Sequence, residues 1–302
     1  MLEKIINSIK YTANKQISLE RIPDNDEQTY QLLRTGRTNG VFQLESQGMK
    51  QVLTSLKPTS FEDIVAVNAL FRPGPMDFIP VYIARKHGKE QVTYPHPDLK
   101  PILEKTFGVL VYQEQIMQIA NRIAGFTLGE ADILRRAVSK KKQDMMDAQK
   151  KAFIDGCLTK GYDLPVAEEI FSWIVKFSNY GFPRSHAVAY SKISYQLAFL
   201  KAHYPASFFA ELLSSTRNQQ EKWIAYMQEL KSMGLELLPP NINRSFGKYT
   251  VEKNQIRMGL SSIKGVGNQS IAEIIRVRKD GPFKNLFDFC LRVSTKWSTA
   301  RL

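Results

Sequence analysis

Helical periodicity with regular interruptions is the feature that most constrains this chain. Four long stretches place apolar residues three and four positions apart and then end at glycine or proline: residues 144–161, 164–181, 185–205 and 219–234. This spacing gathers apolar side chains on one helical face, and the glycine or proline ends the helix. Two further helix starts carry capping-box signatures, Ser60 with Asp63 and Thr127 with Glu130. We predict that residues 1–237 form one mostly helical body.

The pattern changes at Pro239 and Pro240, which close the helical region. Residues 248–261 hold two short segments rich in Tyr, Thr, Val and Ile, separated by the turn-forming pair Asn254 and Gln255. This pattern is typical of a β hairpin. A Gly-Val-Gly turn and a helix with one apolar face follow. The predicted fold class is therefore mainly α with a small β hairpin, followed by a helix-hairpin-helix element.

Positive charge limits the partners of the chain. Lysine and arginine outnumber aspartate and glutamate by 42 to 29, a net charge of +13 that attracts phosphates, so nucleic acid is the first partner to consider. No apolar run approaches the roughly 20 residues that span a bilayer, and the first residues do not resemble a secretory signal. We therefore expect no membrane partner and a cytoplasmic location. Cys157 and Cys290 lie far apart, which supports neither a disulfide framework nor a zinc site.

The Gly-Val-Gly turn at residues 265–267 is a candidate DNA-binding loop. In a helix-hairpin-helix, glycines let backbone amides approach a phosphate, and the dipole of the following helix favours the negative charge. The residues assigned to this site are Lys264, Gly265, Gly267, Arg276 and Arg278. The alternative is that the two glycines only make a tight turn between packed helices.

Residues 127–142 form the densest cationic segment, with Arg135, Arg136, Lys140, Lys141 and Lys142 within eight positions and no acidic residue among them. Arg136 and Lys140 lie one turn apart on a helix, on a face that could bind a triphosphate or a nucleic-acid backbone. The alternative is a solvated helix end, where cations also suit the dipole.

A Pro-Gly-Pro stretch follows Arg72 within residues 71–82. Prolines fix the backbone on both sides of a flexible glycine, so the stretch could present Arg72 rigidly. The commoner alternative is a loop that only redirects one helix into the next.

Residues 179–191 read NYGFPRSHAVAYS and combine a helix end with a helix start. Asn179 and Gly181 would end one helix, Pro183 bars its continuation, and Ser185 suits the cap of the next. In the first turns of that helix lie Arg184, His186 and Tyr190. Guanidinium, imidazole and phenol groups can together hold a phosphate, a sugar hydroxyl and a base, so this segment is a candidate nucleotide site.

Six segments in order resemble the catalytic alpha subunit of bacterial DNA polymerase III, a C-family replicative polymerase. They are GVFQLESQGM (40–49), ALFRPGPM (69–76), VYQEQIM (111–117), ILRRAVSKKK (133–142), residues 180–213 and GLSSIKGVG (259–267). The resemblance implies the end of the palm and the start of the fingers in residues 1–57, a helical fingers domain in 58–237, and a hairpin with a truncated helix-hairpin-helix element in 238–302. The last nine residues, STKWSTARL, depart from the family pattern.

The resemblance also implies the reaction and the roles of residues. In such polymerases three palm carboxylates hold Mg²⁺ ions, and we expect all three upstream of Met1, so that this fragment binds no metal ion and does not catalyse nucleotide transfer alone. Arg135, Arg136 and Lys140 would contact the triphosphate, and His186 and Tyr190 would face the incoming nucleotide, with Arg184 and Ser185 as further candidates. The expected partners are primer-template DNA and a deoxynucleoside triphosphate, with the sliding clamp and clamp loader bound through parts of the subunit outside this chain.

Two alternatives remain open from the sequence. One is a non-catalytic DNA-binding protein in which residues 265–267 are the working part. The other is a self-contained phosphotransfer enzyme that uses carboxylates such as Asp24, Asp26 or Asp77. Because Asp24 and Asp26 follow a proline and precede a helical pattern, helix capping explains them without a metal ion.

Overall fold

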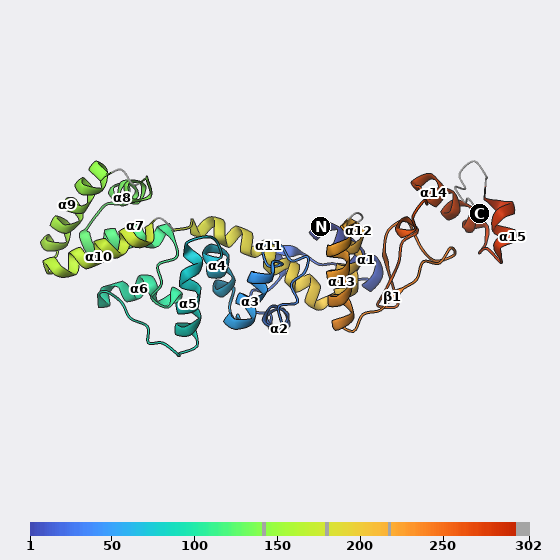
Figure 1. Ribbon diagram of the computed structural model, residues 1–302, viewed down its shortest axis with the longest axis horizontal. Coiled ribbons are helices and arrows are strands. Elements are labelled where there is room, and N and C mark those ends of the chain that lie inside the picture. Colours follow the sequence, from blue (N-terminus) through green and yellow to red (C-terminus); the bar gives the residue numbers. More distant parts are fainter. Residues whose placement is uncertain (141–142, 179–180, 217–218, 294–302) are drawn as a thin grey trace. The chain divides into compact units, whose positions relative to one another are not determined.

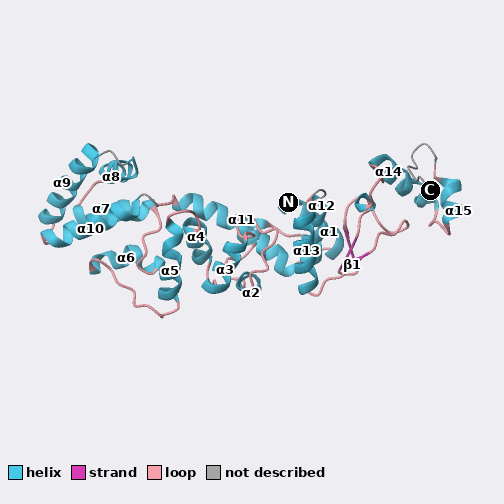
Figure 2. Cartoon of the chain, viewed as in Figure 1, coloured by secondary structure: helices cyan, strands magenta, loops and turns pink. Residues whose placement is uncertain are grey.

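The structure is a computed structural model that describes residues 1–140, 143–178, 181–216 and 219–293. Helices dominate the described chain, and its strands are short (Figure 2). The chain divides into two compact units, one of residues 33–36 and 46–195 and the other of residues 1–32, 37–45 and 196–302. The helices α2 (Glu27–Arg34) and α11 (Arg184–His203) contribute residues to both units.

The unit of residues 33–36 and 46–195 is helical. Its elements are α3 (Gln47–Leu56), α4 (Phe61–Leu70), α5 (Ile79–Lys86), α6 (Lys100–Leu103), α7 (Gln113–Ala124), α8 (Leu128–Lys140), α9 (Gln143–Thr159), α10 (Leu164–Ser178) and the first part of α11. The predicted helix starts are confirmed. The Asp63 carboxylate accepts from the amide of Ser60 at 3.1 Å, and Thr127 and Glu130 cap each other's amides at 3.3 and 2.8 Å.

The helices α7, α8, α9 and α10 pack around one apolar core (Figure 1). Their fully buried side chains include Ile119, Leu134, Phe153 and Ile174, one from each of the four helices. The backbones of α9 and α7 approach closely at Gly156, where an added Cβ atom would lie 2.2 Å from the Ala124 carbonyl oxygen. A larger residue would therefore force the two helices apart.

The second unit contains α1 (Leu2–Ala13), most of α2, the last part of α11, α12 (Pro205–Ser215) and α13 (Gln220–Ser232). Its core holds a charged side chain. Lys201 is completely buried, donates to Glu229 and to the Asn39 carbonyl oxygen, and lies about 5 Å from the rings of Phe208 and Phe209. A buried charge is costly unless an opposite charge pairs with it, and Glu229 provides that charge. Lys201 therefore ties the end of α11 to α13.

The β region of this unit differs from the predicted hairpin. A third strand, β1 (Leu237–Leu238), pairs in parallel with β3 (Gln255–Arg257), which pairs antiparallel with β2 (Thr250–Glu252). The turn comprises Lys253 and Asn254, with φ of 50° and 63°, rather than Asn254 and Gln255. Two consecutive positive φ angles suit the twist of a two-residue hairpin, and this places Gln255 in the strand. The strand β1 was missed because a two-residue strand has too little alternation to show in sequence.

A small separate core supports the end of the described chain. Leu260, Ile271, Ile274, Val277 and Phe283 pack together between α14 (Asn268–Val277) and α15 (Leu286–Arg292). Helix α14 therefore presents its polar face away from this core, while Val266 of the loop before it packs against the core.

Candidate nucleotide and nucleic-acid sites

Residues 111–115 organise the first candidate site. The Gln115 side-chain oxygen accepts from the amides of Val111 and Tyr112, each at 2.9 Å, and its side-chain nitrogen donates to Thr106 at 2.9 Å. These bonds satisfy amides at the start of α7 that have no partner within the helix. The segment is therefore held rigidly beside the residues that pair with it.

Residues 181–184 pair with this segment. The Phe182 amide donates to the Val111 carbonyl at 3.1 Å, and the Gln113 amide donates to the Phe182 carbonyl at 3.1 Å. Both carboxylate oxygens of Glu114 accept from the Arg184 amide at 3.0 Å. Helix α11 therefore begins at Arg184, and its first amide is capped by a carboxylate from α7.

The predicted cap at Ser185 is therefore wrong, because Ser185 lies inside the first turn of α11. Glu114 supplies the acceptor that a capping hydroxyl would provide. Gly181 lies outside α10, which ends at Ser178, while the predicted helix end at Asn179 lies outside the described residues.

Aromatic and cationic side chains gather at the start of α11. The Phe182 and His186 rings are 5.3 Å apart, the His186 and Tyr190 rings are 4.1 Å apart, and the Arg72 guanidinium lies 4.6 Å from the Phe182 ring. His186 and Tyr190 lie one turn apart, as their spacing predicted, and the structure shows that both are exposed. Partial burial lowers the pKa of Arg72, yet a guanidinium stays charged at neutral pH. The sequence left open whether Arg72 is presented to a ligand or only belongs to a connecting loop. In the structure its side chain lies beside Phe182, next to the candidate residue His186.

Arg184 and Ser185 extend this cluster in different ways. The Arg184 guanidinium pairs with Glu62 at 2.6 Å and lies 5.8 Å from the Tyr112 ring, whose hydroxyl pKa is raised by burial. Ser185 is exposed. An anion that approached Arg184 would therefore compete with Glu62.

The two arginines of α8 have different surroundings. Arg135 donates to Asp132 at 2.7 Å and to the Gln113 side-chain oxygen at 3.0 Å, which connects it to the start of α7. Arg136 also pairs with Asp132, at 2.6 Å, but its side chain is 62% exposed. Hydrogen bonding from Arg135 lowers the pKa of Asp132, and Arg136 adds to that effect. The side chain of Lys140, and Lys141 and Lys142 entirely, lie outside the described residues.

Gln113 and Glu114 are residues that sequence reasoning did not assign to the site. Through them Arg135 on α8 is linked to Phe182 and Arg184 at the start of α11. The signal that could have identified them is the segment VYQEQIM, whose polar residues directly follow an apolar pair.

The second candidate site surrounds the Gly-Val-Gly loop. Gly265 has a φ of +89°, a backbone conformation that suits glycine, and Gly267 is the N-cap of α14 with open space where a Cβ atom would stand. Lys264 is exposed beside them. Arg276 is 67% exposed and pairs with Glu273 at 2.9 Å. The loop backbone and two of the three predicted cations are thus accessible.

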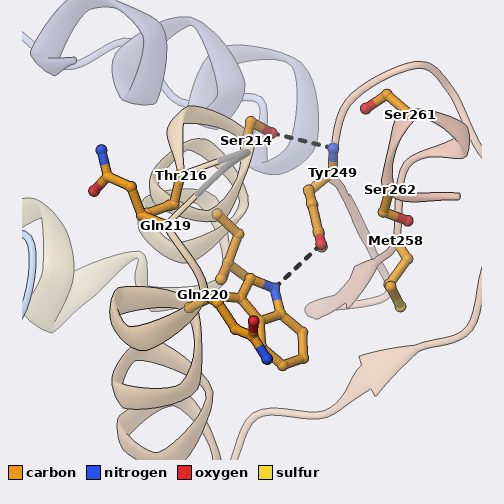
Figure 3. Close-up of a pocket in the computed structure, with 10 residues that line it drawn as sticks. Ser214, Thr216, Gln219, Gln220, Tyr249, Met258, Ser261 and Ser262 are labelled. Carbon is orange, nitrogen blue, oxygen red and sulfur yellow. Dashed lines mark hydrogen bonds between the residues drawn. The ribbon is translucent and has the colours of Figure 1, made fainter. Parts of the chain in front are cut away.

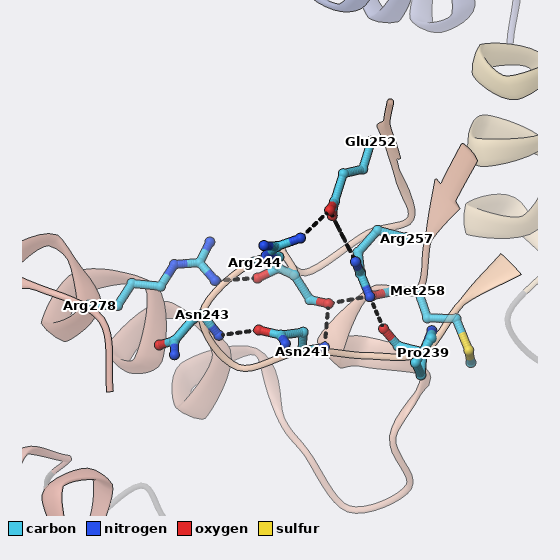
Figure 4. Close-up of polar contacts among 9 residues, drawn as sticks. Pro239, Asn241, Asn243, Arg244, Glu252, Arg257, Met258 and Arg278 are labelled. Carbon is cyan, nitrogen blue, oxygen red and sulfur yellow. Dashed lines mark hydrogen bonds and ion pairs between the residues drawn. The ribbon is translucent and has the colours of Figure 1, made fainter. Parts of the chain in front are cut away.

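Arg278 is placed differently from the other predicted cations. Its Nη1 donates to the carbonyl of Ser245 at 2.6 Å (Figure 4) and to that of Ile242 at 3.1 Å. Its guanidinium lies 4.8 Å from the Phe246 ring. Burial lowers its pKa. Arg278 therefore ties the turn that follows Pro239 and Pro240 to the end of α14.

The same turn is tied to the sheet by an ionic cluster (Figure 4). Glu252 pairs with Arg257 at 2.8 Å and with Arg244 at 2.7 Å, and Arg257 also donates to the Pro239 carbonyl at 2.7 Å. These contacts hold the turn that contains Arg244 against the strands β2 and β3.

A pocket of about 470 Å³ lies between the ends of α12 and α13 and the sheet (Figure 3). Ser214 accepts from the Tyr249 amide at 3.1 Å, and Trp223 donates to the Tyr249 hydroxyl at 3.4 Å. Its lining is neutral: Leu213, Ser214, Thr216, Gln219, Gln220, Trp223, Tyr249, Met258, Ser261 and Ser262. It contains none of the predicted site residues.

The carboxylates considered as metal ligands do not form a site in the described residues. Asp26 caps α2 by accepting from the Thr29 amide at 2.8 Å, and it contacts His203 at 2.9 Å. Partial burial acts to raise its pKa, but the bonds from Thr29 and His203 outweigh this and lower it. Within the described ranges, no group of three or more His, Cys, Asp or Glu residues could hold a metal ion. In the same ranges, no helix combines the length and apolarity needed to cross a bilayer.

Two family models match the chain. The model described as bacterial DNA polymerase III alpha subunit finger domain matches residues 1–161, and one described as a helix-hairpin-helix motif matches residues 234–302. The predicted fold class, mainly α with fingers followed by a helix-hairpin-helix element, is thereby confirmed.

Curated relatives named DNA polymerase III subunit alpha are similar over almost the whole chain. The protein from Bacillus subtilis (strain 168) is 53% identical over 98% of this chain and 26% of its own length. That from Halalkalibacterium halodurans is 50% identical over 100% of this chain and 27% of its own length. That from Staphylococcus epidermidis is 47% identical over 100% of this chain and 28% of its own length. The chain thus spans about a quarter of the relatives it matches.

Proposed function

Because this chain belongs to the bacterial DNA polymerase III alpha subunit family, we propose that it forms the part of a DNA-directed DNA polymerase that holds the incoming deoxynucleoside triphosphate and contacts primer-template DNA. The reaction of the complete subunit is nucleotidyl transfer, in which the primer 3′-hydroxyl attacks the α-phosphate and pyrophosphate leaves. This chain contributes binding and orientation to that reaction.

One observation carries the proposal. Gln113 and Glu114 connect Arg135 with the start of α11, where Phe182, His186 and Tyr190 form a ladder of rings. Cations linked in this way to exposed aromatic side chains suit a ligand with a polyphosphate and a base. The same unit therefore offers groups for both ends of a nucleotide.

The roles of the residues follow from their exposure and charge. Arg135 and Arg136, with Lys140, neutralise the triphosphate, and Arg184 adds a further cation when the ligand displaces Glu62. His186 and Tyr190 face the nucleoside or its phosphates, and Ser185 adds a hydroxyl. Such positioning lowers the barrier of an in-line transfer because the reacting groups meet in a fixed geometry.

Mg²⁺ enters this proposal only at the level of the complete subunit. The described residues offer no carboxylate cluster that fits a divalent ion. We propose that carboxylates outside these 302 residues hold Mg²⁺ in the complete subunit, while the residues of this chain bind and orient the nucleotide.

The helix-hairpin-helix element contacts the DNA backbone in this proposal. The amides of Gly265 and Gly267 approach a phosphate at the start of α14, and Lys264 and Arg276 supply positive charge, with Arg278 holding the loop in place. We propose further that the complete subunit works in the cytoplasm with a sliding clamp and a clamp loader, which bind segments outside this chain.

The test is direct binding by the 302-residue chain. Binding of dATP and of a fluorescent primer-template is measured with and without Mg²⁺, and incorporation is assayed in parallel. Binding of both ligands, weakened by salt and without incorporation, supports the proposal. Duplex binding without dATP binding would instead favour a helix-hairpin-helix DNA-binding protein. Metal-dependent incorporation lost on changing Asp24, Asp26 or Asp77 would favour a self-contained phosphotransfer enzyme.

A further inference from the structure

Gln113 lies between two elements that carry proposed triphosphate contacts. Its side-chain oxygen accepts from Arg135 at 3.0 Å, its side-chain nitrogen donates to the Gly181 carbonyl at 3.0 Å, and its amide donates to the Phe182 carbonyl at 3.1 Å. These three groups at the start of α7 are thus directed to partners from distant parts of the chain. A glutamine that only covered the helix surface would not need this arrangement.

The neighbouring Glu114 holds the helix that follows Phe182. Both of its carboxylate oxygens lie 3.0 Å from the Arg184 amide, although the two residues are 70 positions apart. A carboxylate at this point satisfies an unpaired amide and suits the positive end of the dipole of α11. The start of α11 and the side chain of Arg135 are therefore attached to adjacent residues.

Close packing at Gly181 restricts this junction further. A Cβ atom at Gly181 would lie 3.1 Å from the Gln113 Cγ atom and 3.5 Å from its Cα atom. The backbone before α11 therefore rests directly on Gln113. A displacement of either segment would disturb the other, because close-packed contacts transmit small shifts.

We propose that Gln113 is a positioning residue that couples Arg135 on α8 to residues 181–186, so that the proposed phosphate-binding groups of the two helices keep one relative geometry. The inference rests on the proposed nucleotide site and assigns Gln113 no contact with the ligand. An arginine side chain loses considerable rotational freedom when it binds a phosphate. Gln113 and Asp132 orient the guanidinium of Arg135 beforehand, so less of that cost falls on nucleotide binding.

The test compares Gln113→Met with Asn121→Ala in the 302-residue chain. Methionine keeps the size of glutamine but removes both side-chain hydrogen bonds. Asn121 donates to the Phe126 carbonyl at 2.6 Å at the other end of α7, so its replacement removes a comparable bond without touching the junction. We expect the Kd for dATP to rise about tenfold in Gln113→Met and to stay unchanged in Asn121→Ala.

A second readout separates positioning from general destabilisation. The side-chain Nε–Hε NMR signal of Arg135, assigned with Arg135→Lys, and the amide signals of Phe182 and Arg184 should shift together in Gln113→Met and stay in place in Asn121→Ala. Gly181→Ala provides a second variant that disturbs the same contact without altering Gln113, and it should shift the same signals.

The outcomes distinguish this inference from the proposed function. If the wild-type chain binds dATP and Gln113→Met binds it equally well, the coupling is contradicted. Signals of Arg135 that stay fixed while those of Phe182 move would also contradict it. If the wild-type chain does not bind dATP, the proposed function fails and the inference that rests on it is overturned with it, whatever the NMR signals show.

Discussion

Arg135 and Arg136 are adjacent in sequence and share Asp132 as a partner, yet their surroundings give them different roles. Arg135 is held from two sides, by Asp132 and by Gln113, whereas Arg136 pairs with Asp132 and keeps a side chain that is mostly exposed. Under the proposed function, a triphosphate recruits Arg136 by displacing a surface ion pair, which contributes little on its own.

We therefore expect Arg136→Ala in the complete subunit to raise the KM for nucleotide about tenfold with little change in primer-template affinity, because a charge-assisted contact to the triphosphate is lost. Steady-state kinetics at varied dATP concentration measure the first quantity, and fluorescence anisotropy measures the second. Lys105→Ala, which removes a positive charge at an exposed position in the same unit, is the matched control. An unchanged KM for Arg136→Ala would exclude this assignment.

The ion pairs of Glu252 should make the stability of the folded chain depend on pH. Hydrogen bonding from Arg257, together with Arg244, lowers the pKa of Glu252 from 4.5 to about 2. Because the pKa is lower in the folded state, the stabilising contribution is complete above about pH 4.5 and is lost as pH falls toward 2. Wild type should therefore exceed Glu252→Gln in urea stability at pH 6, and the difference should shrink at pH 3. Glu169→Gln, at an exposed position on α10, is the control, and a gap independent of pH would contradict the assignment.

At the scale of elements, the proposed function places the ligand-binding groups of this chain at two helix starts. The Glu114 carboxylate already accepts from the first amide of α11. A ligand at this helix start would therefore contact the surrounding side chains and not the backbone amide. The start of α14 has open space above Gly267, and its loop amides can approach a phosphate. The two helix starts thus suit different parts of a nucleic-acid substrate.

Gly267→Asp separates structure from binding at α14. Aspartate is a preferred N-cap and suits the helix dipole, so the variant should be more stable by roughly a few tenths of a kcal/mol. The same charge repels a phosphate, so duplex DNA affinity should fall about tenfold or more. Thermal unfolding and anisotropy measure the two effects, with Gly267→Ser as the neutral capping control. Equal DNA affinity of both variants would mean that the loop is only a turn.

At the scale of the whole molecule, charge is unevenly distributed. Residues 251–302 contain ten basic and four acidic residues, and ten minus four gives +6 of the total +13 in about the last sixth of the chain. Nearly half of the net positive charge therefore lies in the segment that contains the helix-hairpin-helix element.

Primer-template binding by the chain should consequently weaken steeply with salt, by about a hundredfold or more between 50 and 200 mM. Lys264→Glu should reduce the slope of log affinity against log salt by about one. Lys105→Glu changes the net charge equally but lies in the other unit, and it should leave the slope nearly unchanged. Equal slopes for both variants would show that Lys264 makes no specific phosphate contact.

The sequence by itself determined the helical class, the capping boxes at Ser60 and Thr127, and the family. The helical class and the capping boxes depend on the spacing of residues within a few positions, which local backbone geometry determines. The one-turn spacing of His186 and Tyr190 on α11 followed for the same reason. The family follows from short segments in a given order.

Only the tertiary structure decided which residues meet. The cap of α11 comes from Glu114, 70 positions away, and β1 finds its parallel partner in β3, although residues 239–254, which contain β2, lie between them in sequence. Arg278 lies with the predicted DNA-binding cations in sequence, but its guanidinium is directed to the carbonyls of Ile242 and Ser245. Such contacts leave no periodic signal, because a hydrogen bond between distant segments depends on how the intervening chain packs.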